Sequence, residues 1–438
     1  MSTAPTPRLD AIEATLADLI PDLCADPNPR GRPEVLPGAL LWTGLLVCIL
    51  RGQSSQQALW RLLSQAGLWT FPQVPVTAEA VRIRLQRSGP AVMQELFTQV
   101  SAELAVSLAP DEDLAPFATG VYAIDESTLD RIARTLPALR DVPAGDDRLL
   151  PGRLITAFDV RAQQFHTVQT TELPRQNEKV AAHDLVATLP TQSLILADLG
   201  YFSFPWFDAL TDAGYWYVSK LRAKTSTVTA HVLAARGQLR DELVWLGAYR
   251  ANRAGHLVRR IQVPVGDRVH VSITNVLDPD DLSMAAVVRL YARRWDIELA
   301  FKTIKRDLGL HLLWSARWEL ILTQVFGVLL IAQIAMALRA EIAQRAEVDL
   351  FDVSLGLLLR DLPYLMRDGD GDVITRIAAL PRVRGGYIRP ARRHRPVVPE
   401  DLVITPPPAG LIRERTARYD GRRCGPDGGQ YRPILRGD

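Results

Sequence analysis

The chain has 438 residues, of which 47% are hydrophobic and 23% are charged, so it is long enough for two or three globular domains with substantial cores. Its formal net charge of only +2 excludes strong attraction to a polyanion through overall charge and leaves local basic patches for that role. The three cysteines, Cys24, Cys48 and Cys424, have neither CxxC spacing nor a histidine cluster, which argues against a zinc site or a disulfide framework and suits a reducing compartment.

Residues 1–115 are expected to form an all-helical N-terminal domain, because three segments separated by Pro and Gly show helical periodicity. These segments are 37–50, 55–66 and 77–106. Arg82, Arg84 and Arg87 in the third segment could place a basic helix in a nucleic-acid groove. A surface helix that carries arginines for solubility is an equally good interpretation, since a short basic helix alone does not establish base readout.

Two apolar segments that follow each end near a single aspartate. Val121 to Ser127 predicts a strand with Asp125 near its end, and Ser193 to Asp198 predicts a buried strand whose aspartate emerges just before the turn at Gly200. Carboxylate oxygens are the ligands that hard cations such as Mg²⁺ prefer. The two strand ends are therefore candidate metal-binding positions.

The elements around these two aspartates follow the order β-β-β-α-β-α-β, in which the first three strands form an antiparallel meander. After the Asp125 strand, the predicted elements are strands over 153–160 and 164–170, a helix over 178–189, the Asp198 strand, a helix over 204–213 and a strand over 215–221. This order resembles the ribonuclease H-like nuclease core, an α/β fold. A fold alone does not decide the function.

A helix over 291–305 is the most informative segment, because one tyrosine, two cations and one carboxylate share one of its faces. At about 100° per residue they fall within about one sixth of the helix circumference. They are Tyr291, Arg294, Glu298 and Lys305. An apolar stripe, roughly a quarter turn away, would seat the helix on a core. It consists of Ile297, Phe301, Ile304 and Leu308.

Arg294 and Glu298 could be an ordinary surface pair, worth only about 0.2–0.5 kcal/mol. The two strand-end aspartates favour another interpretation, because Asp125, Asp198 and Glu298 together would make a hard-cation site. Two Mg²⁺ ions about 3.5–4 Å apart, with Mn²⁺ as a substitute, could activate the attacking oxygen and stabilise the leaving oxygen of a phosphoryl transfer.

The other polar side chains of the same helix face suit a phosphate-containing substrate. Arg294 would hold phosphates as a fork and Lys305 as a point charge. Tyr291 could donate a hydrogen bond to a phosphate oxygen.

Two later segments carry further signals. Residues 320–338 are apolar enough to consider as a membrane span, but Thr323, Gln324 and Gln333 interrupt them, so a buried helix packed behind the 291–305 helix is expected. Residues 382–438 hold thirteen arginines against six acids and are rich in Pro and Gly. This tail would be a basic arm that follows phosphates, or else a solvated linker without a partner.

The tyrosine, arginine, glutamate and lysine of the 291–305 helix are separated by two, three and six residues. This spacing resembles, without a gap, the signature of DDE transposases of the insertion-sequence-4 type. Ile124-Asp-Glu-Ser127 and Ala197-Asp-Leu-Gly-Tyr201 look like the two aspartate motifs of the same family. The resemblance covers the chain from about Val121 to about Arg339, and more loosely the helical N-terminal part.

The resemblance implies a transposase that nicks DNA at the ends of an insertion sequence, forms a hairpin on the transposon end and joins that end to target DNA. It implies that Asp125, Asp198 and Glu298 are the catalytic residues and the ligands of two Mg²⁺ ions. The implied DNA phosphate contacts are Tyr291, Arg294 and Lys305. The implied partners are double-stranded DNA, as terminal inverted repeats and as target, and a second copy of the chain in a homodimer on paired ends.

Family members also carry a β-rich insertion between the second aspartate and the glutamate, and residues 222–280 contain strand-like runs at 257–264 and 268–274. In relatives a tryptophan of this insertion stacks on a flipped base. Trp245 is expected to be a core residue instead, because a lone tryptophan in a strand is more often buried. Leu199 stands where the family commonly has arginine, so Lys220 or Arg222 would have to supply that phosphate contact.

The expected organisation is a helical DNA-binding domain over 1–115, a ribonuclease H-like catalytic domain over 116–345 with its β-rich insertion at 222–280, and a helical segment with a basic tail over 346–438. Two alternatives remain, which are a DNA-binding remnant that no longer cuts and a related metal-dependent DNA endonuclease. Residues 1–29 lack the pattern of a secretory signal, so the expected location is the bacterial cytoplasm, in association with the nucleoid and not with a membrane.

Overall fold

The computed structural model describes most of the chain between residues 35 and 408. The described residues are 20, 35–53, 55–67, 73–107, 111–129, 138, 140–143, 146, 149, 152–172, 178–247, 253–265, 268–365, 373–390, 398–399, 401–408 and 411.

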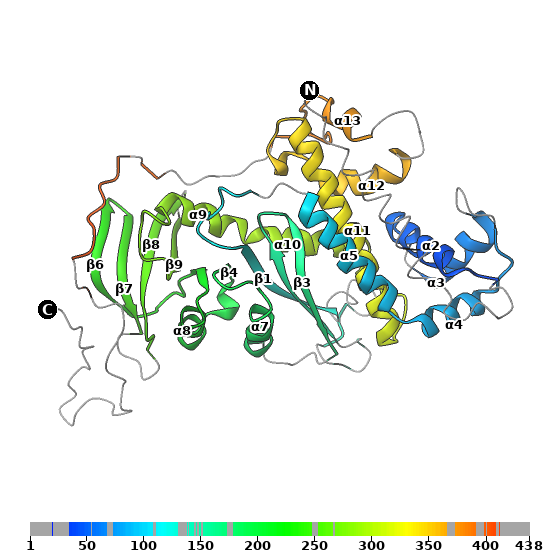
Figure 1. Ribbon diagram of the computed structural model, residues 1–438, viewed down its shortest axis with the longest axis horizontal. Helices are drawn as coiled ribbons and strands as arrows, with labels where there is room; N and C mark the ends of the chain where they lie inside the picture. The colour runs from blue at the N-terminus through cyan, green and yellow to red at the C-terminus, as the bar shows by residue number, and fades with distance from the viewer. Residues whose placement is uncertain are drawn as a thin grey trace.

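One mixed sheet of nine strands, in the order β3-β2-β1-β4-β5-β9-β8-β7-β6, runs through the described part of the molecule (Figure 1). The strands are β1 (Val121–Thr128), β2 (Arg153–Asp159), β3 (Gln164–Thr171), β4 (Leu194–Ala197), β5 (Trp216–Lys220), β6 (Thr227–Arg236), β7 (Leu239–Leu246), β8 (Leu257–Val265) and β9 (Arg268–Thr274). The first three strands are antiparallel to one another, whereas β4 is parallel to both β1 and β5.

Helices cover both faces of this sheet. The α-helices are α2 (Gly38–Leu50), α3 (Gln56–Arg61), α4 (Ala78–Ser88), α5 (Ala91–Ser107), α7 (Glu178–Val186), α8 (Phe204–Asp212), α9 (Met284–Arg293), α10 (Trp295–Lys302), α11 (Trp318–Arg345), α12 (Leu355–Leu365) and α13 (Val373–Ala378). Short turns of other helix types are η1 (Leu62–Ala66), η3 (Leu199–Tyr201), η4 (Thr303–Asp307) and η5 (Leu350–Asp352). The succession β1, β2, β3, α7, β4, α8, β5 confirms the predicted element order and is consistent with a ribonuclease H-like core.

Alternate residues of β1 and β4 pack into two different cores, because successive side chains of a strand point to opposite faces. One set packs against α5, α10 and α11 and the other against α7 and α8, which lie on the opposite side of the sheet (Figure 1). The first set is Val121, Ala123, Leu194 and Leu196. The second set is Tyr122, Ile124, Ile195 and Ala197. Burial on both faces explains why these strands read as continuous apolar runs.

Strands β6 to β9 continue the same sheet, since β9 pairs with β5. The strand-like runs predicted at 257–264 and 268–274 are confirmed as β8 and β9. Trp245 on β7 is only 2% exposed, which confirms that it is a core residue. The buried Arg259 binds Asp241 across β7 and β8 at 2.6 Å, so the two strands are joined by an ion pair as well as by their backbone.

The N-terminal helices depart from the prediction in one respect. The single helix expected over 77–106 is two helices, α4 and α5. Helix α4 ends because Gly89 takes a φ of +63°, which favours glycine, and Pro90 follows it without an amide hydrogen. Helical periodicity continues across this break and therefore concealed it. On α4, Arg82 is paired with the neighbouring Glu79, as in the interpretation of a solvated surface helix.

Helix α11 is long and apolar enough to cross a membrane, but 83% of its most apolar stretch is buried inside the protein. This burial is that of a core helix, as expected for 320–338. Gln333, one of the residues that interrupt the apolar run, is fully buried and binds the backbone of Phe165 on the edge strand β3. Its Oε1 accepts from the Phe165 N–H at 2.9 Å and its Nε2 donates to the Phe165 carbonyl at 3.0 Å.

The basic tail predicted over 382–438 lies partly outside the described residues. Its first part, up to residue 390, packs on the segment that precedes α12. The N–H of Arg389 donates to the Asp352 carbonyl at 2.8 Å, and the N–H of Ser354 donates to the Tyr387 carbonyl at 2.8 Å. Arg382 forms an ion pair with Asp352. These contacts hold residues 382–390 against the protein.

Candidate active site

The two predicted aspartates lie side by side where the parallel pairing of the central strands β1 and β4 ends. β1 and β4 pair in parallel with Ala123 opposite Leu196, so extending this register by two residues places Asp125 opposite Asp198. Neighbouring strands are about 4.7–4.9 Å apart. Both carboxylates project toward the face that α10 covers, because Ala123 and Leu196 belong to the core on that face.

The third predicted carboxylate, Glu298, is carried by α10, which packs on β1. The predicted apolar stripe holds this helix in place, since all four of its residues are at most 5% exposed. They are Ile297, Phe301, Ile304 and Leu308. The core beneath α10 therefore decides where Glu298 lies relative to the strand-end aspartates.

The helix predicted over 291–305 is interrupted twice. Arg294 is the joint at which α9 ends and α10 begins, and a π-helical turn, η4, starts at Thr303. A π-helical turn changes the angle between successive side chains, so Lys305 no longer lies at the angle that an ideal α-helix gives it. The ideal-helix prediction was wrong at this residue because apolar spacing alone does not distinguish the two helix types.

Strand register and the packing of α10 on β1 bring the three carboxylates into one region, and their charges act on one another. Burial raises the pKa of Asp125 to about 6. The N–H of Glu126, which donates to Asp125 Oδ1 at 2.8 Å, and the charge of Arg294 oppose this rise in pKa, whereas the charges of Glu298 and Asp198 add to it. Asp125 therefore stands next to both other acids and to the cation predicted beside them.

Arg294 is the internal partner of Glu298. Its Nη2 donates to Glu298 Oε1 at 2.6 Å, and the arginine side chain is only 5% exposed. Burial lowers the pKa of Arg294 while this hydrogen bond and the nearby negative charges raise it, and the balance is a raised pKa. The Nε and Nη1 atoms of Arg294 are buried without a hydrogen-bond partner, so the guanidinium retains donors for a further acceptor.

Tyr291 belongs to the same group, whereas the contacts of Lys305 differ. Burial raises the pKa of the Tyr291 hydroxyl, with Arg294 opposing and Asp198 and Glu298 adding to the rise. The ammonium of Lys305 lies 5.6 Å from the centre of the Phe301 ring. The structure thus brings Asp125, Asp198, Glu298, Arg294 and Tyr291 into one region, and Lys305 lies on the π-helical turn that follows α10.

The donor atoms of this site are of the kind that a hard divalent cation prefers, because they are carboxylate oxygens. Within the described residues, however, no group of three or more His, Cys, Asp or Glu side chains is arranged to hold a metal ion. Glu298 is bound to Arg294 instead. Mg²⁺ usually takes one or two carboxylates together with substrate phosphate oxygens, so the residues fit such an ion as part of a complex with substrate.

Two further residues at the site were missed or left undecided by the sequence. Trp295 is 56% exposed beside the buried Arg294, whose guanidinium lies 5.2 Å from the indole ring. In the sequence, the only indication of this arrangement is that Trp295 directly follows Arg294 in the predicted helix. Arg222 donates to the Leu199 carbonyl at 3.1 Å, so it reaches the position after Asp198 where a basic residue was expected.

Comparisons with known proteins agree with this geometry. Residues 123–334 match the family described as transposase DDE domain. No curated protein sequence matches the chain. Among solved structures, the chain is similar to piggyBac transposase in a synaptic complex with hairpin DNA, with a TM-score of 0.41 and 9% sequence identity over 86% of this chain and 80% of that chain. That structural similarity is too weak to support an inference. The family match, which spans Asp125, Asp198 and Glu298, supports a DDE transposase.

Proposed function

We propose that the protein is a cut-and-paste transposase of an insertion sequence, which nicks the element ends, forms a hairpin on them and joins them to target DNA. The observation that carries this proposal is the meeting of Asp125, Asp198 and Glu298 where the parallel pairing of β1 and β4 ends, within the region that matches the transposase DDE domain.

In the proposed reaction Asp125, Asp198 and Glu298 would hold two Mg²⁺ ions together with substrate phosphate, and these ions would supply activation of the attacking oxygen and stabilisation of the leaving oxygen. Asp125 lies within β1, just beyond the last residue that pairs with β4, and Asp198 directly follows β4. Glu298 approaches from α10. The raised pKa of Asp125 means that its carboxylate is ionised above about pH 6. A neighbouring positive charge would favour that ionised form further.

Substrate phosphate is held by the donors of the catalytic helix. Arg294 keeps two buried donor atoms without a partner beside Glu298, so a phosphate oxygen can be accommodated without desolvating a new cation. Tyr291 adds a hydroxyl on the same side, and Lys305 adds a charge from the π-helical turn. A homodimer assembled on paired terminal repeats, in the bacterial cytoplasm with the nucleoid, completes the proposal.

The DNA-binding remnant is the second candidate, and the ion pair between Arg294 and Glu298 favours it. A glutamate permanently held by arginine would leave DNA binding intact without cutting. Cleavage distinguishes the two candidates.

The test is cleavage of DNA that carries the ends flanking this gene, in Mg²⁺, with products separated on a denaturing gel. Wild type should give nicks at the element boundary that convert to hairpin and joined products. Glu298→Ala should give none while it still binds the ends, because a metal ligand is lost and the basic contacts remain. Glu319→Ala, which removes an exposed glutamate from α11, is the matched control and should cut like wild type.

Binding without cutting by the wild type, under conditions in which a known transposase cuts its own ends, would establish the remnant. Cutting that gives hydrolysed ends without any joined product would instead identify an endonuclease.

A further inference from the structure

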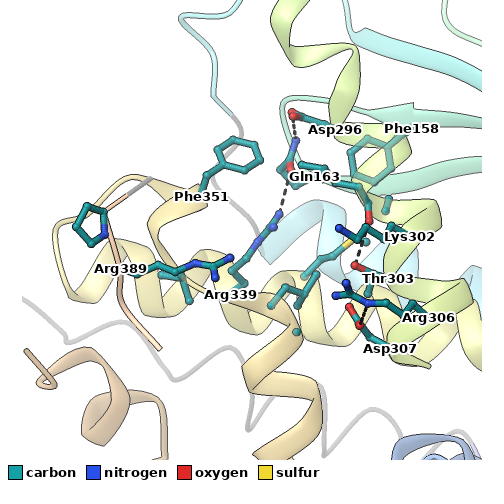
Figure 2. Close-up of a pocket in the computed structure, with 17 residues that line it drawn as sticks. Phe158, Gln163, Asp296, Lys302, Thr303, Arg306, Asp307, Arg339, Phe351 and Arg389 are labelled. Carbon is teal, nitrogen blue, oxygen red and sulfur yellow. Dashed lines mark hydrogen bonds and ion pairs between the residues drawn. The ribbon is translucent and has the colours of Figure 1, made fainter. Parts of the chain in front are cut away.

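A groove runs along the flank of α10, roughly a third of a turn around the helix from Glu298. It consists of two adjoining cavities of about 470 and about 950 Å³. Both cavities are lined by Arg306, Asp307, Gly356 and Arg389, so they are continuous. We call this surface the basic groove. Its walls come from α10, η4, α11, α12, the segment ending at residue 390 and the end of α2 (Figures 1 and 2).

Six cationic side chains and two carboxylates line the basic groove. The cations are Arg51, Lys302, Arg306, Arg339, Arg360 and Arg389. Six cations and two carboxylates give the groove a formal charge of +4, which exceeds the formal charge of +2 for the whole chain. Both carboxylates already have arginine partners, because Asp296 binds Arg293 at 2.5 Å and Asp307 binds Arg306 at 2.7 Å.

Lys302 and Arg389 are the two cations that no described residue neutralises. Both side chains are exposed, and no hydrogen bond or ion pair joins either of them to another described residue. Figure 2 shows the Arg389 side chain directed toward Arg339, which also lines the cavity. The Arg339 guanidinium donates to Gln163 and packs on the Phe351 ring, so it keeps its positive charge in the same cavity. Two cationic side chains in one cavity favour the binding of an anion there.

The position of Arg389 is built into the fold. Its own N–H binds the Asp352 carbonyl, and the preceding Ile388 forms an antiparallel bridge with Val353. The opposite wall is equally defined, since Lys302 belongs to α10 and Arg306 to the turn that follows. The two walls are therefore set by ordered backbone and not by loose side chains.

The shape and lining of the basic groove indicate the kind of anion. The cations are spread along two connected cavities, which a single phosphate would not fill. The larger cavity has no aromatic lining residue, whereas proteins that bind single strands stack bases on aromatic side chains. The smaller cavity is lined by two phenylalanines, of which Phe158 is 1% exposed and Phe351 packs against the guanidinium groups of Arg293 and Arg339. Spread cations with so little aromatic surface fit the backbone of a duplex.

We propose that the basic groove binds the sugar-phosphate backbone of duplex DNA at a distance from the reacting phosphate. This proposal rests on the proposed function, because it assumes that the protein acts on DNA. Lys302 lines the groove and is one helical turn after Glu298 on α10. A duplex held there is held against the helix that carries Glu298.

The test compares wild type with Lys302→Glu/Arg389→Glu for binding of duplex DNA of random sequence over a series of salt concentrations. Loss of two phosphate contacts should lower the slope of log affinity against log salt by about two and weaken binding at fixed salt by about tenfold or more. Lys302→Arg/Arg389→Lys should bind like wild type, because charge is retained. Arg140→Glu/Arg268→Glu, which makes the same charge change at two exposed arginines outside the groove, is the matched control.

Equal affinity and equal salt slope for the Glu double variant and wild type would overturn the proposal. So would loss of inorganic pyrophosphate binding in that variant with duplex binding unchanged, since the occupant would then be a small phosphate. Cleavage is assayed on the same preparations. If the wild type never cuts DNA, the proposed transposase function is wrong. If the Glu double variant still has a lower salt slope than wild type, DNA binding by the basic groove is supported all the same.

Discussion

The surroundings of Asp125 disfavour the ionised form of its carboxyl group. Burial, Glu298 and Asp198 all raise its pKa, and the nearby Arg294 only partly offsets them. A group whose pKa is higher in the folded state than in the unfolded state destabilises the fold once it is ionised. The free energy of unfolding should therefore fall as the pH rises from about 4 to about 6 and remain lower above that range.

Asp125→Asn should raise the free energy of unfolding at pH 8 in the absence of divalent cations. A pKa that moves from 3.8 to about 6 corresponds to about 3 kcal/mol. Asparagine keeps the oxygen that accepts from the Glu126 N–H. Urea unfolding at several pH values measures the effect, and the gain should shrink as the pH falls below 6 and vanish below about pH 3, where wild-type Asp125 is protonated in both states. A variant no more stable than wild type at pH 8 would contradict the proposed environment of this carboxylate.

Helix α10 is bonded to the sheet from the side opposite the face that carries Glu298. Asp296, 3% exposed, accepts from Arg293 Nε at 2.5 Å and from Gln163 Nε2 at 2.9 Å. Gln163, in the turn between β2 and β3, in turn accepts from Arg339 on α11 at 3.0 Å. One buried carboxylate thus links α10, the turn between β2 and β3, and, through Gln163, the long core helix α11.

Asp296→Ala should destabilise the protein by about 1–3 kcal/mol, because Arg293 and Gln163 lose a buried acceptor and keep, among the described residues, only the Val160 carbonyl and, for Arg293, Asp111. Asp307→Ala on the following turn is the matched control. Its partner Arg306 is 63% exposed, so the loss there should be less than about 1 kcal/mol. Denaturant unfolding of both variants beside wild type checks the difference, and equal losses would show that the Asp296 network contributes no more than a surface ion pair.

Both edges of the nine-stranded sheet are covered by segments distant in sequence. At one edge, Gln333 of α11 binds the N–H and the carbonyl of Phe165 on β3. At the other edge, the Thr405 N–H donates to the Leu233 carbonyl of β6 at 2.7 Å, and Arg236 pairs with Asp401. Exposed strand edges invite pairing with other chains, so these contacts protect the sheet as a whole.

Gln333→Leu should destabilise the whole molecule, because two backbone groups of Phe165 lose a buried partner at about 1–3 kcal/mol each. Gln344→Leu places the same substitution at an exposed position of α11, and its effect should stay within about 0.5 kcal/mol. Unfolding experiments combined with light scattering measure both stability and association. Wild-type stability of the Gln333 variant would show that the edge of β3 needs no side-chain cover.

The sequence by itself determined most of the local elements and predicted which three acids would form a site. Alternating and continuous apolar runs identified the strands, because a strand buried on one face has apolar residues at every second position and one buried on both faces has them throughout. Spacing along 291–305 identified Glu298 and Arg294, since positions three and four apart share a helix face whatever the rest of the chain does. The break at Gly89 and the π-helical turn at Thr303 escaped it, because neither interrupts the apolar period.

Only the tertiary structure decided how these elements meet. The parallel register of β1 and β4 brings Asp125 beside Asp198 from a position 73 residues distant in the chain, and the packing of α10 on β1 adds Glu298. Pairing of β9 with β5 extends one sheet across the chain. The basic groove exists because α10, α12 and residues 385–390 pack together. Such long-range contacts depend on the complementary shapes of buried surfaces, which no local period in the sequence specifies.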